Sequence, residues 1–495
     1  MSAEITQLKN KTMSGFIWKF GERIIAQLVS LVVSIILARL LTPEDYSVVG
    51  IVAIFFAFAN VFISGGFNAA LIQKKDADIE DYSSVLFISL ISAALIYIIL
   101  FFCAPFIAKA YDQDILIAVF RVMGLTLFIN AFKSVLCAYV SRHLQFRKFF
   151  LSTIVGTIIS AIVGITMAAN GFGPWALVAQ QMINATIDTI ILFFTTRVRF
   201  IFKISRNSTK ALFKYGWKIL VASSVSVLYD EINPLIIGLK YTGADLSYYT
   251  KGKSFPQLVN STVGSTLSAV LFPVMSKMQD DKSAILNYTR RFMQLSSYLI
   301  FPMMIGFLAV ADKFILVLLT DKWLSATIYI QIFCIVYMFD IIQTGNLQVI
   351  RAIGRSDLIL ILEVTKKVLY AIVILCFVLF SNKPEYLALA SIINTVIATI
   401  INTAPNRKLI GYRYRLQIVD LFPNFLMAIV MGIAVYAIGL LKINIYLLLI
   451  IQVFTGIIVY FLLSLFLKNR NLKYILTSLK NFSRKDKQVK NDSEN

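Results

Sequence analysis

The side chains of this sequence that could do chemistry are charges embedded in long apolar segments. Each costs about 2.5 to 3.5 kcal/mol at the centre of a membrane helix, so such side chains normally face a protein interior or a water-filled cavity. Cations outnumber acids among them, which favours a site for an anionic group such as a pyrophosphate. The embedded cations are Lys19, Arg23, Arg39, Arg121, Lys133, Lys218, Lys366 and Lys367, and the embedded acids are Glu22, Asp188, Asp230, Glu231, Asp340 and Glu363.

Five of these cations are the candidates for an anion-binding cavity. Arg121 and Lys133 are twelve residues apart in one apolar segment, a separation of about 18 Å along a helix. Arg39 is close to the end of its segment, where a long basic side chain can instead snorkel to the interface. The proposed cationic cavity therefore comprises Arg121, Lys133, Arg23, Lys366 and Arg39.

Three acids are the candidates for ion coupling. Asp230 and Glu231 are adjacent in one apolar segment, and burial that raises a carboxyl pKa would let one of them carry a proton. Glu22 is the third candidate, although it could simply pair with Lys19, three residues earlier. Pairing of Asp230 or Glu231 with a basic residue elsewhere is the structural alternative.

Local helix geometry suggests one structural ion pair. Glu363 and Lys367 have i, i+4 spacing, which places their side chains next to each other on a helix. On that expectation, Lys366 points elsewhere and remains available to a cavity.

The pattern of residues does not indicate an enzyme. His143 is the single histidine and lies beside Arg142 in a short basic loop, where contact with headgroups explains it better than catalysis. The sequence contains no metal-ligand cluster and no phosphate-binding GxxxxGK[ST] loop. We therefore expect no metal, no cofactor and no catalytic residues.

The composition requires lipid as the solvent for most of the chain. Hydrophobic residues make up 58% of the 495 residues, only 15% are charged, and mean hydropathy is +0.79, whereas soluble domains are about a quarter charged. Apolar runs of about 20 residues predict fourteen spans. These spans are 16–41, 46–72, 84–108, 115–140, 150–170, 175–196, 216–239, 255–275, 292–311, 325–350, 358–380, 385–403, 420–441 and 444–467.

The distribution of Lys and Arg predicts that both termini are cytoplasmic. With that orientation, 31 basic residues lie in cytoplasmic segments and 8 in the opposite loops, in agreement with the positive-inside rule. The net charge of +21 therefore indicates orientation and headgroup contact, and no nucleic-acid partner is expected.

A weak internal repeat suggests two lobes. ARLLTPEDYS ends the first span and GLKYTGADLS ends the seventh, with Thr42, Asp45 and Ser47 matching Thr242, Asp245 and Ser247. Six spans separate the copies, so the repeats should be parallel, an arrangement used by transporters with rocking lobes. Chance similarity between apolar sequences is the alternative.

The predicted organisation is an all-α integral membrane protein with two parallel six-helix lobes and two further helices. The lobes comprise residues 1–205 and 206–419, the additional spans 420–467, and a basic cytoplasmic tail 468–495.

Several longer segments together form a recognisable pattern over most of the first twelve spans. They are ARLLTPEDYSVVG, GFGPWALVAQQ, LIIGLKYTGADLSYYTKGKSFPQL, FPVMSKMQDD, FPMMIGFLAVADKFILVLLTDKW and AIGRSDL. In these segments the chain resembles the polysaccharide-exporting flippases of the multidrug/oligosaccharidyl-lipid/polysaccharide superfamily, which share a MATE-like fold. The similarity is greatest to O-antigen, colanic-acid and capsule repeat-unit translocases.

The resemblance implies an inner-membrane protein that flips an undecaprenyl-pyrophosphate-linked oligosaccharide by alternating access. Basic cavity residues would hold the pyrophosphate, a proton or sodium gradient would drive the cycle, and a polymerase or glycosyltransferase complex is a possible partner. Relatives often carry an acid in the seventh span where this chain has Asn233. The alternatives are a multidrug exporter of the same superfamily, a lipid II flippase and a membrane polysaccharide polymerase.

Overall fold

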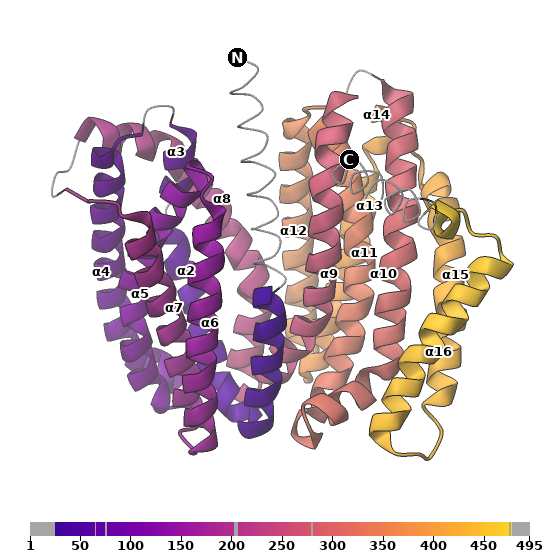
Figure 1. The fold of residues 1–495 in the computed structure, drawn as a ribbon, viewed down its shortest axis with the longest axis horizontal. Helices are drawn as coiled ribbons and strands as arrows, with labels where there is room; N and C mark the ends of the chain where they lie inside the picture. The colour runs from indigo at the N-terminus through magenta and orange to yellow at the C-terminus, as the bar shows by residue number, and fades with distance from the viewer. Residues whose placement is uncertain are drawn as a thin grey trace, which may run out of the picture. The chain divides into compact units, whose positions relative to one another are not determined.

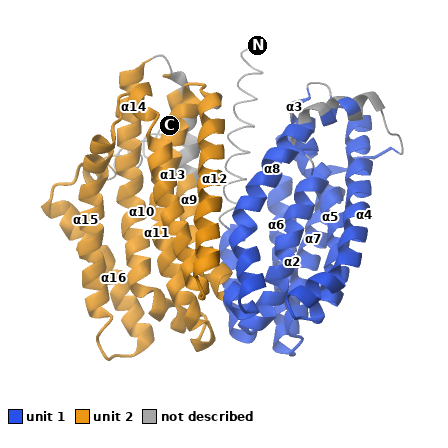
Figure 2. Cartoon of the chain, turned by 180° about the vertical axis from the view of Figure 1, so that it is seen from behind, with its two compact units in different colours: residues 1–247 blue, residues 248–495 orange. Residues whose placement is uncertain are grey.

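The computed structural model describes residues 25–64, 66–74, 77–201, 206–278, 281–474 and 477. Every regular element within these ranges is helical, as the coloured ribbon of Figure 1 shows. The chain divides into two compact units, residues 1–247 and 248–495, which are coloured separately in Figure 2.

The first unit consists of antiparallel helices joined by tight turns. A short apolar helix, Ile25–Leu40, precedes them. Helix α4 packs on α5 and helix α6 on α7. The α6–α7 turn uses Gly171 and Gly173 at positive φ, followed by Pro174 in the first turn of α7, where its missing N–H costs no hydrogen bond. The bounds are α2 Pro43–Ser64, α3 Phe67–Gln73, α4 Ile79–Ala110, α5 Ile115–Arg142, α6 Phe146–Ala169, α7 Pro174–Thr196 and α8 Arg206–Lys240.

The second unit is organised around α10, which packs against α11, α15 and α16. Helix α9 begins just before the boundary between the units and continues into the second unit. The bounds are α9 Gly243–Lys277, α10 Lys282–Leu318, η1 Asp321–Ala326, α11 Thr327–Ala352, α12 Ser356–Phe380, α13 Pro384–Thr403, α14 Asn406–Leu409, α15 Tyr414–Ile438 and α16 Ile445–Phe466.

The predicted membrane architecture is confirmed. Eleven helices of the described residues are long and apolar enough to cross a membrane. Three more predicted spans correspond to Ile25–Leu40, whose first part lies outside the described residues, to α9 and to α12. The fourteen predicted spans are therefore consistent with the helices observed.

The two copies of the internal repeat adopt the same local structure. Thr42 N and Oγ1 donate to Asp45 Oδ2 at 2.9 and 3.1 Å, and Asp45 N donates to Thr42 Oγ1 at 3.3 Å. Thr242 and Asp245 make the same three hydrogen bonds, at 3.1, 2.7 and 3.2 Å. Each set caps the start of a helix, so the shared residues have a common structural role.

The predicted lobe boundaries, 205/206 and 419/420, mark where the two repeats of the sequence begin and end. They need not coincide with the boundary between the two compact units. The compact units divide the chain at 247/248, because α8 packs on α2 and α3 of the first unit. The repeat boundaries stay a prediction.

Candidate functional site

An ion pair inside the first unit joins α5 to α7. Lys133 Nζ lies 2.6 Å from Asp188 Oδ2, and the two side chains are 33% and 9% exposed. The lysine therefore extends from partial exposure toward a buried carboxylate. A pair with this asymmetry leaves the cation open to a second anionic partner on its exposed side.

A glycine and a pair of asparagines position the helices that carry Lys133 and Asp188. Gly156 of α6 lies against α7, since a Cβ at that position would be 3.1 Å from Asn184 Oδ1 and 3.3 Å from the Asp188 Cβ. Close approach of this kind is what glycine provides between membrane helices. One turn before Lys133, Asn130 Nδ2 donates to Asn60 Oδ1 of α2 at 3.1 Å. This amide pair is an interhelical contact between α2 and α5.

Arg121 has an aromatic neighbour. Its guanidinium carbon lies 4.2 Å from the centroid of the Phe101 ring on α4, a cation–π arrangement. Its Nε is buried and has no hydrogen-bond partner in the part of the chain that the structure describes. Tyr97 OH donates to the Arg121 carbonyl oxygen at 3.2 Å, and Gly124 makes room for the Tyr97 ring.

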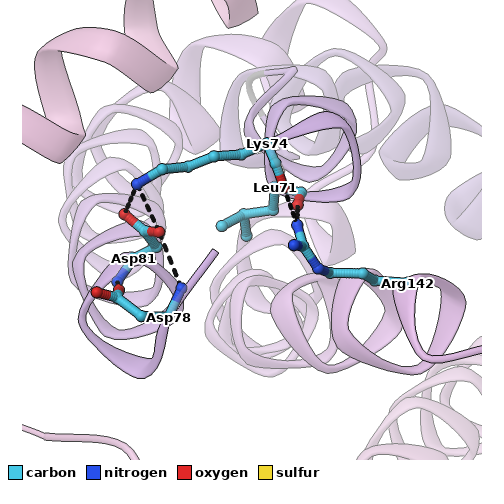
Figure 3. Close-up of polar contacts among 5 residues, drawn as sticks. All are labelled: Leu71, Lys74, Asp78, Asp81 and Arg142. Carbon is cyan, nitrogen blue, oxygen red and sulfur yellow. Dashed lines mark hydrogen bonds and ion pairs between the residues drawn. The ribbon is translucent and has the colours of Figure 1, made fainter. Parts of the chain in front are cut away.

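Other cations at one end of this unit have structural roles, as Figure 3 shows. Arg142 Nη1 donates to the carbonyl oxygens of Leu71 and Lys74, which end helix α3. Lys74 Nζ lies 2.6 Å from both oxygens of Asp81, and Asp81 forms a capping box with Asp78 at the start of α4. These side chains fix the α3–α4 connection.

A second charged cluster lies inside the second unit. Asn260 Nδ2 of α9 donates to Asp340 Oδ2 of α11 at 2.7 Å, and Lys366 of α12 interacts electrostatically with Asp340. Lys366 is buried, and its Nζ also lies 2.7 Å from Glu363 Oε1. The cluster therefore combines an amide–carboxylate hydrogen bond with a buried ammonium group that is paired with Glu363.

The expectation that Lys366 points away from Glu363 was wrong. Lys366 Nζ lies 2.7 Å from Glu363 Oε1, three residues earlier in the helix. Spacings of three and of four residues are both compatible with contact on a helix.

The remaining predicted site residues are Arg23, Glu22, Arg39, Asp230 and Glu231. Arg23 and Glu22 lie outside the described residues. Arg39 is exposed near the end of its helix, Asp230 is exposed on α8 and Glu231 is half-buried beside it. The sequence identified Asp188 and Asp340 as embedded acids but assigned them no role, since their partners are distant in the chain.

The family model that describes polysaccharide biosynthesis proteins matches residues 36–328. Among curated relatives, the succinoglycan biosynthesis transport protein ExoT of Rhizobium meliloti is 26% identical over 59% of this chain and 59% of its own length. The chain therefore matches less than two thirds of that relative. The teichuronic acid biosynthesis protein TuaB of Bacillus subtilis is 23% identical over 88% and 90% of the two chains. The lipopolysaccharide biosynthesis protein WzxC of Escherichia coli is 20% identical over 88% of both.

Solved structures show the same fold. The lipid II flippase MurJ in an inward closed conformation aligns with a TM-score of 0.76 and 16% identity, covering 92% of this chain and 99% of MurJ. An inward-facing MATE multidrug transporter aligns at 0.62 and 14% identity, covering 78% and 94%. These matches confirm the predicted MATE-like fold.

The apolar helices and the fold agree on an integral membrane protein. Because the family model covers more than half of the sequence, this chain belongs to the polysaccharide biosynthesis protein family.

Proposed function

We propose that this protein flips an undecaprenyl-pyrophosphate-linked oligosaccharide, a repeat unit of a surface polysaccharide, across a bacterial inner membrane by alternating access. The observation that carries the proposal is Arg121, a cation in a membrane helix that lies over an aromatic ring and whose buried Nε has no hydrogen-bond partner among the described residues. A guanidinium in this setting suits a phosphate oxygen, which offers a charge-assisted hydrogen bond.

Lys133 supports the same assignment. Its ammonium group is held by Asp188 but remains one-third exposed. Arg121 and Lys133 are both on α5, and their spacing of about 18 Å exceeds the size of a pyrophosphate. We therefore assign them successive positions along one path for the headgroup.

The names of the relatives support the substrate class. ExoT is described as a succinoglycan transport protein, TuaB as a teichuronic acid biosynthesis protein and WzxC as a lipopolysaccharide biosynthesis protein. These three relatives are named for three different polymers, yet all three are similar in sequence to this chain. That similarity favours recognition of a lipid carrier that the three polymers have in common. The sugar would then be held by weaker polar contacts.

Ion coupling belongs to the same proposal. Asp230, Glu231 and Glu22 remain the candidates from sequence, and the packing adds Asp340, whose carboxylate accepts from Asn260 and is attracted electrostatically by Lys366. Protonation of this carboxyl would remove that attraction, which gives a two-state electrostatic element. We expect Asp340→Asn to bind substrate normally in proteoliposomes but to lose stimulation of flipping by a pH gradient. Gradient stimulation equal to that of the wild type would remove Asp340 from the coupling scheme.

The location and partners follow from this function. We propose cytoplasmic termini, from the basic residues of the alternate loops, and association with the polymerase or glycosyltransferases that use the same lipid carrier.

The test is substitution of Arg121 in the native host. Arg121→Met should reduce surface polysaccharide strongly at unchanged protein level, because it removes the charge and preserves an apolar stem. Lys109→Met, which removes a cation from the exposed end of α4, is the matched control and should export normally. Full export by Arg121→Met would refute the proposed role.

The same strains separate the alternatives. Loss of drug resistance with intact polysaccharide would indicate a multidrug exporter. Lethality from loss of the protein would indicate a lipid II flippase, whose fold this chain shares. Accumulation of flipped but unpolymerised repeat units would indicate a polymerase.

A further inference from the structure

A cluster of uncharged amide side chains is buried in the second unit where α13 ends. Asn402 is on the last turn of α13 and Asn406 begins α14, and both are 0% exposed. Asn346 of α11 is equally inaccessible, and Gln417 of α15 is 4% exposed. Amides without access to water must find partners inside the protein.

Backbone carbonyls fix the orientation of the Asn406 amide. Asn406 Nδ2 donates to the Asn346 backbone oxygen at 3.0 Å and to Asn346 Oδ1 at 2.7 Å. A backbone oxygen can only accept, so rotating this amide by 180° would set two oxygens against each other. Asn406 Oδ1 must therefore point away from Asn346.

The same argument orients Asn402. Gln343 Nε2 donates to the Thr395 backbone oxygen at 3.5 Å, so Gln343 Oε1 faces the other way. That oxygen accepts from Asn402 Nδ2 at 3.3 Å. Asn402 Oδ1 is consequently directed away from Gln343.

Both outward-pointing oxygens lack a partner among the described residues. Asn402 Oδ1 and Asn406 Oδ1 are buried without a hydrogen bond, and they lie four residues apart, about one helical turn. An unsatisfied buried acceptor is unfavourable and rare in folded proteins. Two such acceptors, one on each side of the break between α13 and α14, call for a donor or a cation beside them.

The helix break adds to the negative potential at this point. Pro405 has no N–H, so the carbonyl of Ile401 loses the donor that a continuous helix would supply. The last turn of α13 carries no basic residue, and the nearby Arg407 and Lys408 of α14 are exposed to the outside, so no cation within α13 offsets the partial negative charge of its C-terminus. Broken membrane helices commonly coordinate sodium through such ends and their carbonyl oxygens.

We propose that Asn402 and Asn406 bind one monovalent cation, Na⁺ or K⁺, at the break between α13 and α14. Amide oxygens are suitable ligands for hard cations, and the absence of carboxylates among the cluster's amides favours a single positive charge over a divalent ion. This site is separate from the Asp340 cluster, and its occupancy does not depend on which substrate the protein transports.

The test is cation-dependent stability of the purified full-length protein in detergent. NaCl and KCl are titrated against N-methylglucamine chloride at constant ionic strength, and the melting temperature is measured. We expect a saturable rise with at least one of the two metal ions, with a half-maximal effect in the millimolar range. A melting temperature that does not distinguish metal ions from N-methylglucamine would mean that water fills the site, and would overturn the proposal.

Variants assign the effect to this position. Asn402→Leu should abolish the cation-dependent rise, whereas Asn424→Leu should retain it, because Asn424 is equally buried but bonds Ser297 and Gln294 elsewhere in the unit. Asn402→Asp adds a charge at the same atom and should bind the cation at lower concentration. Should Asn402→Leu fail to fold, an unchanged cation affinity in Asn402→Asp would refute the assignment.

Discussion

Removing the Lys133 ammonium group separates the structural role of this residue from its proposed role in transport. Lys133→Met preserves most of the side-chain volume but leaves the Asp188 carboxylate without its partner 2.6 Å away. Adding Asp188→Asn to the same chain replaces that carboxylate by a neutral amide of nearly the same shape. The double variant therefore contains neither charge and no uncompensated buried acid.

The magnitudes follow from the burial of the two groups. Loss of one partner from a fully buried pair costs about 3–5 kcal/mol, but the Lys133 side chain is 33% exposed and solvent screens part of the interaction. We expect Lys133→Met to lower the free energy of unfolding by about 2 kcal/mol, the range of a hydrogen bond to a charged group. The double variant should recover most of this loss, because buried ion pairs are often replaceable by neutral groups.

Two assays on the same protein decide the outcome. Melting in detergent reports stability, and flipping of a fluorescent undecaprenyl-pyrophosphate-linked glycan in proteoliposomes reports transport. We expect the double variant to be stable but inactive, and Asp188→Asn alone, which retains the cation, to keep substantial activity. Wild-type flipping by the double variant would show that the pair only holds α5 to α7.

Three further predictions concern packing, a buried ion pair and a helix cap. Gly124→Ala should cost about 1–3 kcal/mol by overpacking, since its Cβ would lie 2.4 Å from the Tyr97 ring, and the same substitution made in a Tyr97→Ala background should cause little further loss of melting temperature if this contact is the cause. Asp420→Ala should cost about 3 kcal/mol, because it leaves the Arg290 guanidinium without both of its 2.8 Å bonds; an unchanged melting temperature would contradict this. Hydrogen bonds from the Ala284 backbone and the Ser283 side chain hold the pKa of Asp281 below its ordinary value. The Asp281 cap of helix α10 is therefore fully formed at any pH above the ordinary Asp pKa. It is lost as the pH falls through the lowered pKa of Asp281. Protection factors of the amides in the first turn of α10, measured by hydrogen exchange relative to the intrinsic rate at each pH, should therefore fall on acidification, and Asp281→Asn should remove this loss of protection.

The sequence by itself determined the membrane architecture. Helix positions follow from runs of apolar residues, because lipid satisfies no backbone hydrogen bond and each span must be apolar along its own length. The capping residues at Thr42 and Thr242 were likewise readable, since a cap involves residues only three apart. Local patterns of this kind require no knowledge of the neighbouring helices.

The partners of the embedded charges were decided only by tertiary structure. Lys133 and Asp188 are 55 residues apart on different helices, and a hydropathy pattern contains no information on which faces of two helices meet. For Glu363, helix geometry permits a partner three or four residues later, and the position of Asp340 on α11 favours Lys366. The orphaned oxygens of Asn402 and Asn406 emerge in the same way, because only packing removes water from an amide and fixes which atom lacks a partner.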